Sequence, residues 1–185
     1  VTWIPHSEVL TYEELLTVGK AAAALGIKHI KITGGEPLLR KNVTEFIARL
    51  KKTKGIETVT LTTNGILLPN YIEQLSKAGI DGINISLDTL EEKKFRKLTR
   101  NGEVKDVWKG ISSVIPYDQI NMKINCVLAG KDWQKDAVHV AEIAKKYRIH
   151  VRFIELMPIQ NQEEKGNLEE EIKALLEDVY GPMTL

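Results

Sequence analysis

The segment Ile30-Lys31-Ile32-Thr33-Gly34-Gly35-Glu36-Pro37 joins a strand pattern directly to a turn with two consecutive glycines. Neither glycine has a Cβ atom, so a ligand can approach the backbone closely and the turn can adopt positive φ. Pro37 biases Glu36 towards an extended conformation. These residues predict a bare backbone edge with a carboxylate just beyond it. Such an edge suits an ammonium group better than a phosphate, which favours amides that open a helix beside a Lys or Ser/Thr.

Helix and strand patterns alternate along the rest of the chain. Thr11 and Glu14 predict a capping box for a first helix that continues to about Leu25, where Gly26 stops it. The further helices are predicted at 43–52, from Pro69 to just before Gly79, at 91–98, 104–115, 136–147 and, capped by Asn167, at 168–180. Strands are predicted at 29–33, 58–62, 82–87, 121–128 and 151–156. This alternation implies an α/β fold with parallel strands and right-handed crossovers, either a barrel or an open doubly wound layer of the flavodoxin type.

Polar side chains recur at every second position of several predicted strands, although central parallel strands normally read as continuous apolar runs. The alternating polar residues are His29, Lys31 and Thr33; Thr58, Thr60, Thr62 and Asn64; Asn84, Ser86 and Asp88; and Asn121, Lys123 and Asn125. With a side-chain period of two, each strand has one apolar and one polar face. If helices cover the apolar faces, the polar faces meet around a wet cavity that accepts a polar ligand. The alternative is an antiparallel sheet with one solvated face, and the helix-length segments between the strands argue against it.

Composition excludes several classes of protein. The 185 residues carry a net charge of +1, which argues against a broadly basic nucleic-acid surface. No apolar run approaches the roughly 20 residues of a membrane span. The single cysteine, Cys126, excludes an intramolecular disulfide framework and suits a cytoplasmic protein. It falls on the apolar parity of its strand, so a buried, inert thiol is expected. The four histidines show no metal-ligand spacing.

Six blocks in order resemble radical S-adenosylmethionine (SAM) enzymes, and in particular the GTP 3′,8-cyclase family of molybdenum-cofactor biosynthesis. The blocks are Trp3–Glu8, Leu10–Glu14, Gly34–Pro37, Leu61–Gly65, Ile85–Asp88 and Phe153–Pro158. The resemblance covers almost the whole chain. It implies an incomplete (βα)6 partial barrel, a single domain over 1–185 that lacks the family's first strand and its C-terminal cluster domain.

The resemblance also implies cofactors, a substrate and site residues. In the family a [4Fe–4S] cluster, held by three cysteines, cleaves SAM to a 5′-deoxyadenosyl radical that abstracts hydrogen from the ribose of GTP. The matching SAM-binding positions are Gly34, Gly35, Glu36, Ser86 and Met157. The positions matching substrate contacts are Lys31, Thr62 and Lys123, and Arg152 has the sign and strand position to join them. The family usually has Arg where Lys31 stands, so that contact loses the bidentate fork. No protein side chain is required as an acid or base in the first step.

Two expectations follow from the cysteine count and the missing first strand. The family's Cys-x3-Cys-x2-Cys triplet lies just before the Trp3 region, so these 185 residues alone are expected to be inactive. Strand 29–33 would be an open edge, which makes a homodimer possible. Two other functions stay open: a radical SAM enzyme that acts on another substrate, such as a peptide, and a non-catalytic SAM- or nucleotide-binding module.

Overall fold

The fold is built on one sheet of five parallel strands. The computed structural model describes residues 8–147, 149–156 and 168–182. The strands are β1 (His29–Ile32), β2 (Thr58–Thr63), β3 (Gly82–Ser86), β4 (Asn121–Leu128) and β5 (His150–Glu155). They pair in the order β1-β2-β3-β4-β5, so every strand lies beside its neighbour in the sequence.

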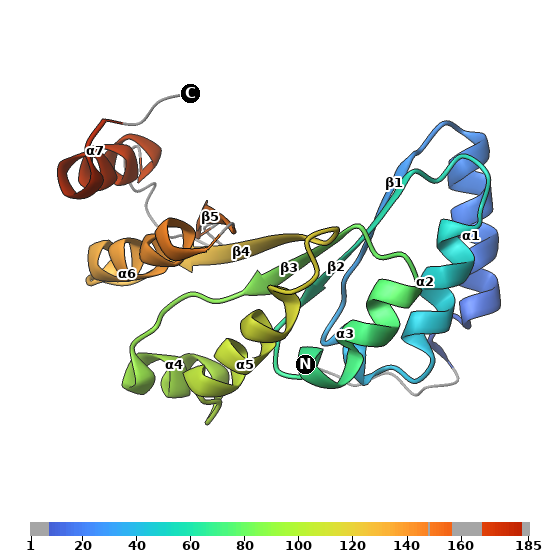
Figure 1. Ribbon diagram of the computed structural model, residues 1–185, viewed down its shortest axis with the longest axis horizontal. Helices are drawn as coiled ribbons and strands as arrows, with labels where there is room; N and C mark the ends of the chain where they lie inside the picture. Colours follow the sequence, from blue (N-terminus) through green and yellow to red (C-terminus); the bar gives the residue numbers. More distant parts are fainter. Residues whose placement is uncertain (1–7, 148, 157–167, 183–185) are drawn as a thin grey trace.

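A helical segment connects each strand to the next. The helices are α1 (Tyr12–Ala24), α2 (Val43–Lys51), α3 (Leu68–Lys77), α4 (Glu92–Thr99), α5 (Val104–Val114), α6 (Trp133–Lys146) and α7 (Leu168–Tyr180), and η2 (Pro37–Leu39) is a short 3-10 turn. In Figure 1 the strands fan from β1 beside α1 and α2 to β5 near α6, and α3 and α5 lie side by side under the middle of the sheet. No helix among the described residues combines the length and the apolar character needed to cross a membrane.

The strand order decides between the architectures that the sequence left open. All four strand pairs are parallel, which excludes the antiparallel sheet. A flavodoxin-like layer reverses its strand order at a switch point, whereas this order runs sequentially from β1 to β5. Sequential parallel strands with helical crossovers form the wall of a (βα) barrel, as expected. Among the described residues β1 has a strand on one side alone, and the prediction of a homodimer stays a prediction.

Local signals place most helix and strand ends as the sequence predicted. Thr11 and Glu14 form both hydrogen bonds of the capping box, and Gly26 has a φ of 88° directly after α1. One boundary differs clearly, because α6 begins at Trp133 rather than at Asp136. Asp136 lies inside the first turn, where it is buried and paired with other side chains. The predicted cap Asn167 lies outside the described residues.

The apolar strand positions form the core. Register places Leu61, Ile83 and Met122 side by side, and Ile85 next to Ile124, all of them buried. Buried side chains from α2, α3 and α5, such as Ile47, Leu75 and Ile111, belong to the same cluster. Each fully buried aliphatic side chain stabilises the fold by about 1.5–3 kcal/mol. The apolar face of the sheet therefore packs against helices, and the opposite face is the one that can bind a ligand.

Candidate functional site

The polar strand residues line up in rows across the other face of the sheet. In the first row, Lys31 pairs with Thr60, which pairs with Gly82 and then Asn121. In the second row, Thr62, Asn84, Lys123 and His150 are in register. In the third row, at the carboxyl end of β3, Ser86 pairs with Asn125, which pairs with Arg152. Residues in register point to the same side of a parallel sheet, so this set forms one surface, the polar face.

The polar face is only partly covered. Lys31, Ser86 and Arg152 are exposed, whereas Thr62 and Lys123 are half-buried. These five candidate residues thus lie on one face, and Thr62 and Lys123 share a row, with Asn84 of β3 between them. Lys31 lies one row farther from the carboxyl ends of the strands. Parallel barrels bind their ligands at those carboxyl ends. Ser86 is the last residue of β3, and Arg152 lies in the same row in β5.

Three cations of the polar face lack a carboxylate partner. Within the described part of the chain, Lys31, Lys123 and Arg152 take part in none of the ion pairs. The carboxylates of Glu36 and Asp88 accept hydrogen bonds from backbone amides, and neither forms an ion pair with Lys123. The polar face is therefore electropositive, which favours a polyanionic ligand.

The paired glycines leave open space beside the end of β1. A Cβ atom built on Gly34 or on Gly35 would meet no atom within 4 Å. Both residues are exposed. This is the bare backbone edge that the sequence predicted, and a ligand can reach its N–H and C=O groups.

Glu36 fastens this edge to the end of β2. One carboxylate oxygen accepts hydrogen bonds from the Leu38 amide at 3.1 Å and from the Thr63 hydroxyl at 2.8 Å. The other oxygen accepts from the Asn64 amide at 2.7 Å. A carboxylate has about four acceptor positions, so these three bonds leave little capacity for a ligand. Glu36 matches a SAM-binding position of the family, and its carboxylate also stabilises the turn.

The turn after β2 has a close contact that sequence patterns did not indicate. Gly65 has a φ of 85°, and its carbonyl oxygen lies against Gly110 in the middle of α5. A Cβ atom on Gly110 would lie 2.0 Å from that oxygen. Gly110 therefore sets how closely α5 packs on the turn that Glu36 holds. The one sequence signal for this contact is a glycine inside a predicted helix, and such a glycine does not show which residue packs against it.

A buried polar cluster holds the segment that follows Ser86. Asp88 accepts a hydrogen bond from the Val127 amide at 2.9 Å, and the Thr89 hydroxyl donates to Asp136 at 2.5 Å. Lys94 donates to the same Asp136 carboxylate. Burial raises the pKa of Asp88, while the hydrogen bond from Val127 acts in the opposite direction. The cluster joins β3, β4 and α6 at the carboxyl end of the sheet.

Cys126 is a buried thiol on the apolar face, as predicted. Its side chain is fully buried, and the sulfur donates to the Asp88 carbonyl oxygen at 3.5 Å. Burial, helped by the nearby Asp88 and Asp136, raises its pKa to about 12. A metal or cluster ligand must be a thiolate, so Cys126 does not fit that role.

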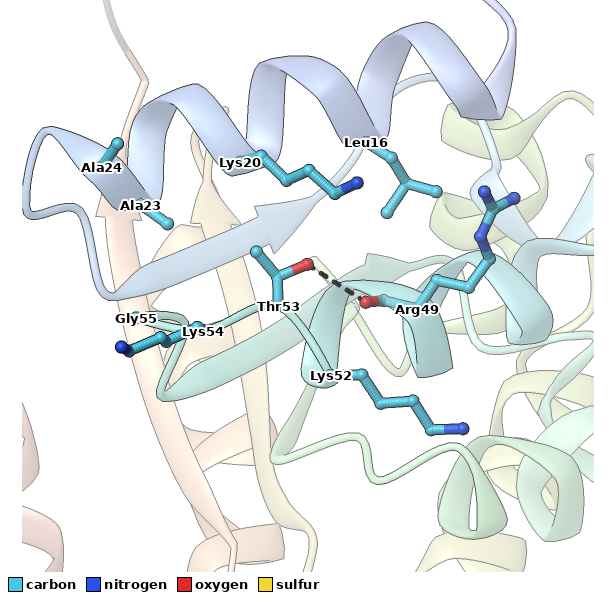
Figure 2. Close-up of a pocket in the computed structure, with 9 residues that line it drawn as sticks. All are labelled: Leu16, Lys20, Ala23, Ala24, Arg49, Lys52, Thr53, Lys54 and Gly55. Atoms are coloured by element: carbon cyan, nitrogen blue, oxygen red, sulfur yellow. Dashed lines mark hydrogen bonds between the residues drawn. The ribbon is translucent and has the colours of Figure 1, made fainter.

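A separate hollow of about 740 Å³ lies between α1, α2 and the loop after α2 (Figure 2). Its lining includes four cations, Lys20, Arg49, Lys52 and Lys54. Arg49 pairs with Glu13 at 2.7 Å. Arg49 lies in the last turn of α2 and Lys52 caps it, where positive charge offsets the helix dipole. None of the lining residues belongs to the polar face.

Gly34, Gly35, Ser86 and Met157 are the other positions that match SAM contacts of the family. Gly34 and Gly35 lie at the open edge, and Ser86 lies in the row nearest the carboxyl ends. Met157 lies outside the described residues. The structure thus brings the substrate candidates onto one face and sets the glycine edge beyond the carboxyl end of β1.

Comparison with known proteins gives a family for this arrangement. The sequence model of the Radical SAM superfamily matches residues 2–172. A GTP 3′,8-cyclase of Heliobacterium modesticaldum is 47% identical over 156 residues, which are 84% of this chain and 48% of that protein. The GTP 3′,8-cyclase of Moorella thermoacetica is 39% identical over 178 residues, 95% of this chain and 55% of the relative. The chain spans about half the length of the curated relatives it matches.

Solved structures share the fold at low sequence identity. SuiB of Streptococcus suis matches with a TM-score of 0.70 and 19% identity, over 94% of this chain and 40% of that one. A structure of anSMEcpe with bound AdoMet matches with a TM-score of 0.68 and 19% identity, over 96% of this chain and 52% of the other. At this identity the likeness concerns the fold alone, and it agrees with the partial barrel described above.

Proposed function

The chain belongs to the Radical SAM superfamily, and from this premise we propose that it is part of a GTP 3′,8-cyclase, which binds SAM and GTP. The proposed reaction converts GTP to (8S)-3′,8-cyclo-7,8-dihydroguanosine 5′-triphosphate in molybdenum-cofactor biosynthesis. Identities of 39–47% to relatives of that name support this choice of substrate.

One observation carries the proposal: the polar face presents three cations that no described carboxylate neutralises. Lys123 is half-buried in the middle of β4, and a cation there without a partner is costly. A triphosphate supplies the missing negative charge. We assign phosphate contacts to Lys123, Lys31 and Arg152, and a neutral hydrogen bond to Thr62.

The glycine edge is assigned to SAM. Gly34 and Gly35 offer accessible backbone groups, and no side chain obstructs them. The methionyl end of SAM carries both an ammonium group, which needs acceptors, and a carboxylate, which needs donors. Backbone C=O and N–H groups supply both. Ser86 is exposed at the carboxyl end of β3 and can donate or accept a further bond. Met157 keeps its assignment as a SAM contact on the strength of the family resemblance.

SAM, when bound, supplies the radical chemistry that the superfamily is named for. The residues of this chain bind and orient the two ligands and exclude water from between them. The superfamily also implies a [4Fe–4S] cluster, whose ligands are cysteine thiolates. Cys126 does not fit that group, because it is buried on the other face with a pKa of about 12. We therefore assign none of these residues to the cluster.

Equilibrium titration of GTP into the intact protein tests the proposal. We expect GTP to bind, and Lys123→Met to weaken binding at least tenfold, since a charge-assisted bond to phosphate contributes about 1.5–3 kcal/mol. Lys77→Met is the control, because Lys77 is exposed on α3 and pairs with Glu73. Binding of GTP that is unchanged in Lys123→Met, or absent from the wild type, would refute the proposal. A radical SAM enzyme specific for a peptide would give the second result.

A further inference from the structure

Asn84 is the most buried polar residue on the polar face. The residue lies at the centre of β3 and is 5% exposed. Parallel strands place Val, Ile and Leu at such positions, and Asn is depleted from strands in general. The two flanking residues, Ile83 and Ile85, follow that rule and are fully buried. An amide at this position therefore calls for hydrogen bonds that justify its burial.

The protein supplies only part of those hydrogen bonds. The Asn84 amide nitrogen donates to the Leu61 carbonyl oxygen at 3.4 Å, a long bond that fixes which way the amide points. The carbonyl oxygen of Asn84 accepts no hydrogen bond from any residue that the structure describes. Among the described residues, the fully buried side-chain atoms without a partner are the Tyr12 and Asn125 oxygens, so the Asn84 oxygen is not sealed inside the protein and a ligand can reach it. The side chain thus holds an acceptor ready for a group that is not part of the sheet.

The neighbours of Asn84 indicate what that group is. In register, Thr62 lies on one side and Lys123 on the other, each one strand away, or about 4.8 Å. Neither side chain donates to Asn84, although both carry donors. On the next row, the Asn125 side-chain oxygen is buried without a partner. The middle of the polar face therefore presents acceptors beside a cation.

From this geometry we infer that Asn84 is a specificity-determining residue that accepts a hydrogen bond from a ribose hydroxyl of the substrate. The inference rests on the proposed function, in which Lys123 binds the triphosphate. Phosphate oxygens at neutral pH carry no proton to donate, so the donor for Asn84 must come from the neighbouring part of the nucleotide. The nearest donors along a ribonucleoside triphosphate are the sugar hydroxyls. Asn84 would thus select ribonucleotides over deoxyribonucleotides.

The test is a binding cycle on the intact protein with three ligands: GTP, 2′-deoxy-GTP and 3′-deoxy-GTP. In the wild type we expect GTP to bind about tenfold more tightly than at least one deoxy analogue, because the analogue leaves the Asn84 oxygen unpaired. Asn84→Leu has nearly the same volume and no acceptor. It should weaken GTP binding about tenfold, leave the affinity for that analogue unchanged, and so abolish the preference.

Controls separate this role from a merely structural one. Asn70→Leu removes an exposed amide from α3 and should keep the wild-type preference. Thermal unfolding checks that each variant is folded, and Asn84→Ala repeats the cycle if the Leu variant does not fold. A preference that persists in the Asn84 variants, or a wild type that binds all three ligands equally, would overturn the inference alone. A wild type that binds no nucleotide would instead overturn the proposed function.

Discussion

The backbone of Gly110 in α5 packs directly on the carbonyl group of Gly65, so closely that a Cβ atom at Gly110 would lie 2.0 Å from that oxygen. The two glycines are 45 residues apart in the sequence. Gly65 belongs to the turn after β2 that Glu36 fastens through Asn64 and Thr63. The position of α5 and the position of the glycine edge are therefore coupled through one turn.

Gly110→Ala should displace this turn. Contacts below 3.0 Å do not occur for real Cβ atoms, and a backbone carbonyl cannot rotate away as a side chain can. We expect a loss of about 1–3 kcal/mol or more in the free energy of unfolding, measured by urea denaturation. Ser112→Ala, an exposed position of the same helix, is the control and should have little effect. Wild-type stability of Gly110→Ala would show that α5 can move away at no cost.

Gly35→Ala should weaken ligand binding and leave the stability unchanged. Its added methyl group meets no protein atom within 4 Å, and Gly35 is not among the residues with positive φ. The stability should stay within about 0.5 kcal/mol of the wild type. If SAM lies against this edge, the methyl group will occupy its place, and the affinity of the intact protein for SAM should fall at least tenfold. Calorimetric titration measures this, and an unchanged affinity would remove Gly35 from the site.

Glu36→Gln should destabilise the protein although it preserves size and shape. The carboxylate accepts three hydrogen bonds through two oxygens, whereas the amide has a single acceptor oxygen. At least one donor then loses its acceptor, which costs about 1–3 kcal/mol in the free energy of unfolding. The exposed Glu73 on α3 is the matched control, and Glu73→Gln should change the stability little. Equal stabilities for the two variants would contradict the structural role of Glu36.

Tyr12→Phe should leave the stability unchanged or raise it. The ring of Tyr12 stacks on Phe46 with centroids 4.6 Å apart, and the Arg40 guanidinium lies 4.1 Å from its centroid. Its hydroxyl oxygen, however, is buried without a hydrogen-bond partner. Removing it avoids a penalty of about 1 kcal/mol while the stacking remains. Tyr12→Leu, which removes the ring as well, should be clearly less stable; a destabilised Phe variant would reveal a partner for the hydroxyl.

Cys126 should resist alkylation in the folded protein. Burial raises its pKa from 9.0 to about 12, so the reactive thiolate is about a thousandfold rarer at pH 8 than in the unfolded chain. The raised pKa also means that the thiol stays protonated to higher pH in the folded state than in the unfolded chain. Its contribution to the free energy of unfolding is complete below pH 9 and is lost as the pH rises towards 12. Iodoacetamide labelling at pH 8, followed by mass spectrometry with and without urea, checks this, and rapid labelling without urea would contradict it.

Local sequence signals predicted the elements of the fold well. The capping box at Thr11 and Glu14 and the stop at Gly26 are contained within a few residues, and the structure forms all of them. Strand positions followed from alternation, because the apolar parity is buried against helices while the polar parity is not. The order of the strands was not contained in any single segment, and a count of five strands left two architectures open.

Long-range contacts explain what sequence patterns could not provide. Asp136 looked like the beginning of a helix, but it is buried with Thr89 and Lys94, which lie over 40 residues earlier. The Glu36 carboxylate seemed available to a ligand because its partner Thr63 is 27 residues away. The hydrogen bonding of the Asn84 side chain likewise depends on its neighbours in β2 and β4. Periodicity shows which face a residue occupies, but it does not show which donors the neighbouring strands bring.

The sequential strand order has a consequence for how the chain acquires its structure. Every strand pairs with the strand that precedes it in the sequence. Each pairing therefore closes only one crossover and requires no segment from farther along the chain. Pairing between consecutive strands keeps the contact order lower than a rearranged strand order would. A growing chain can thus extend the sheet one strand at a time as it leaves the ribosome, with each finished edge serving as the template for the next.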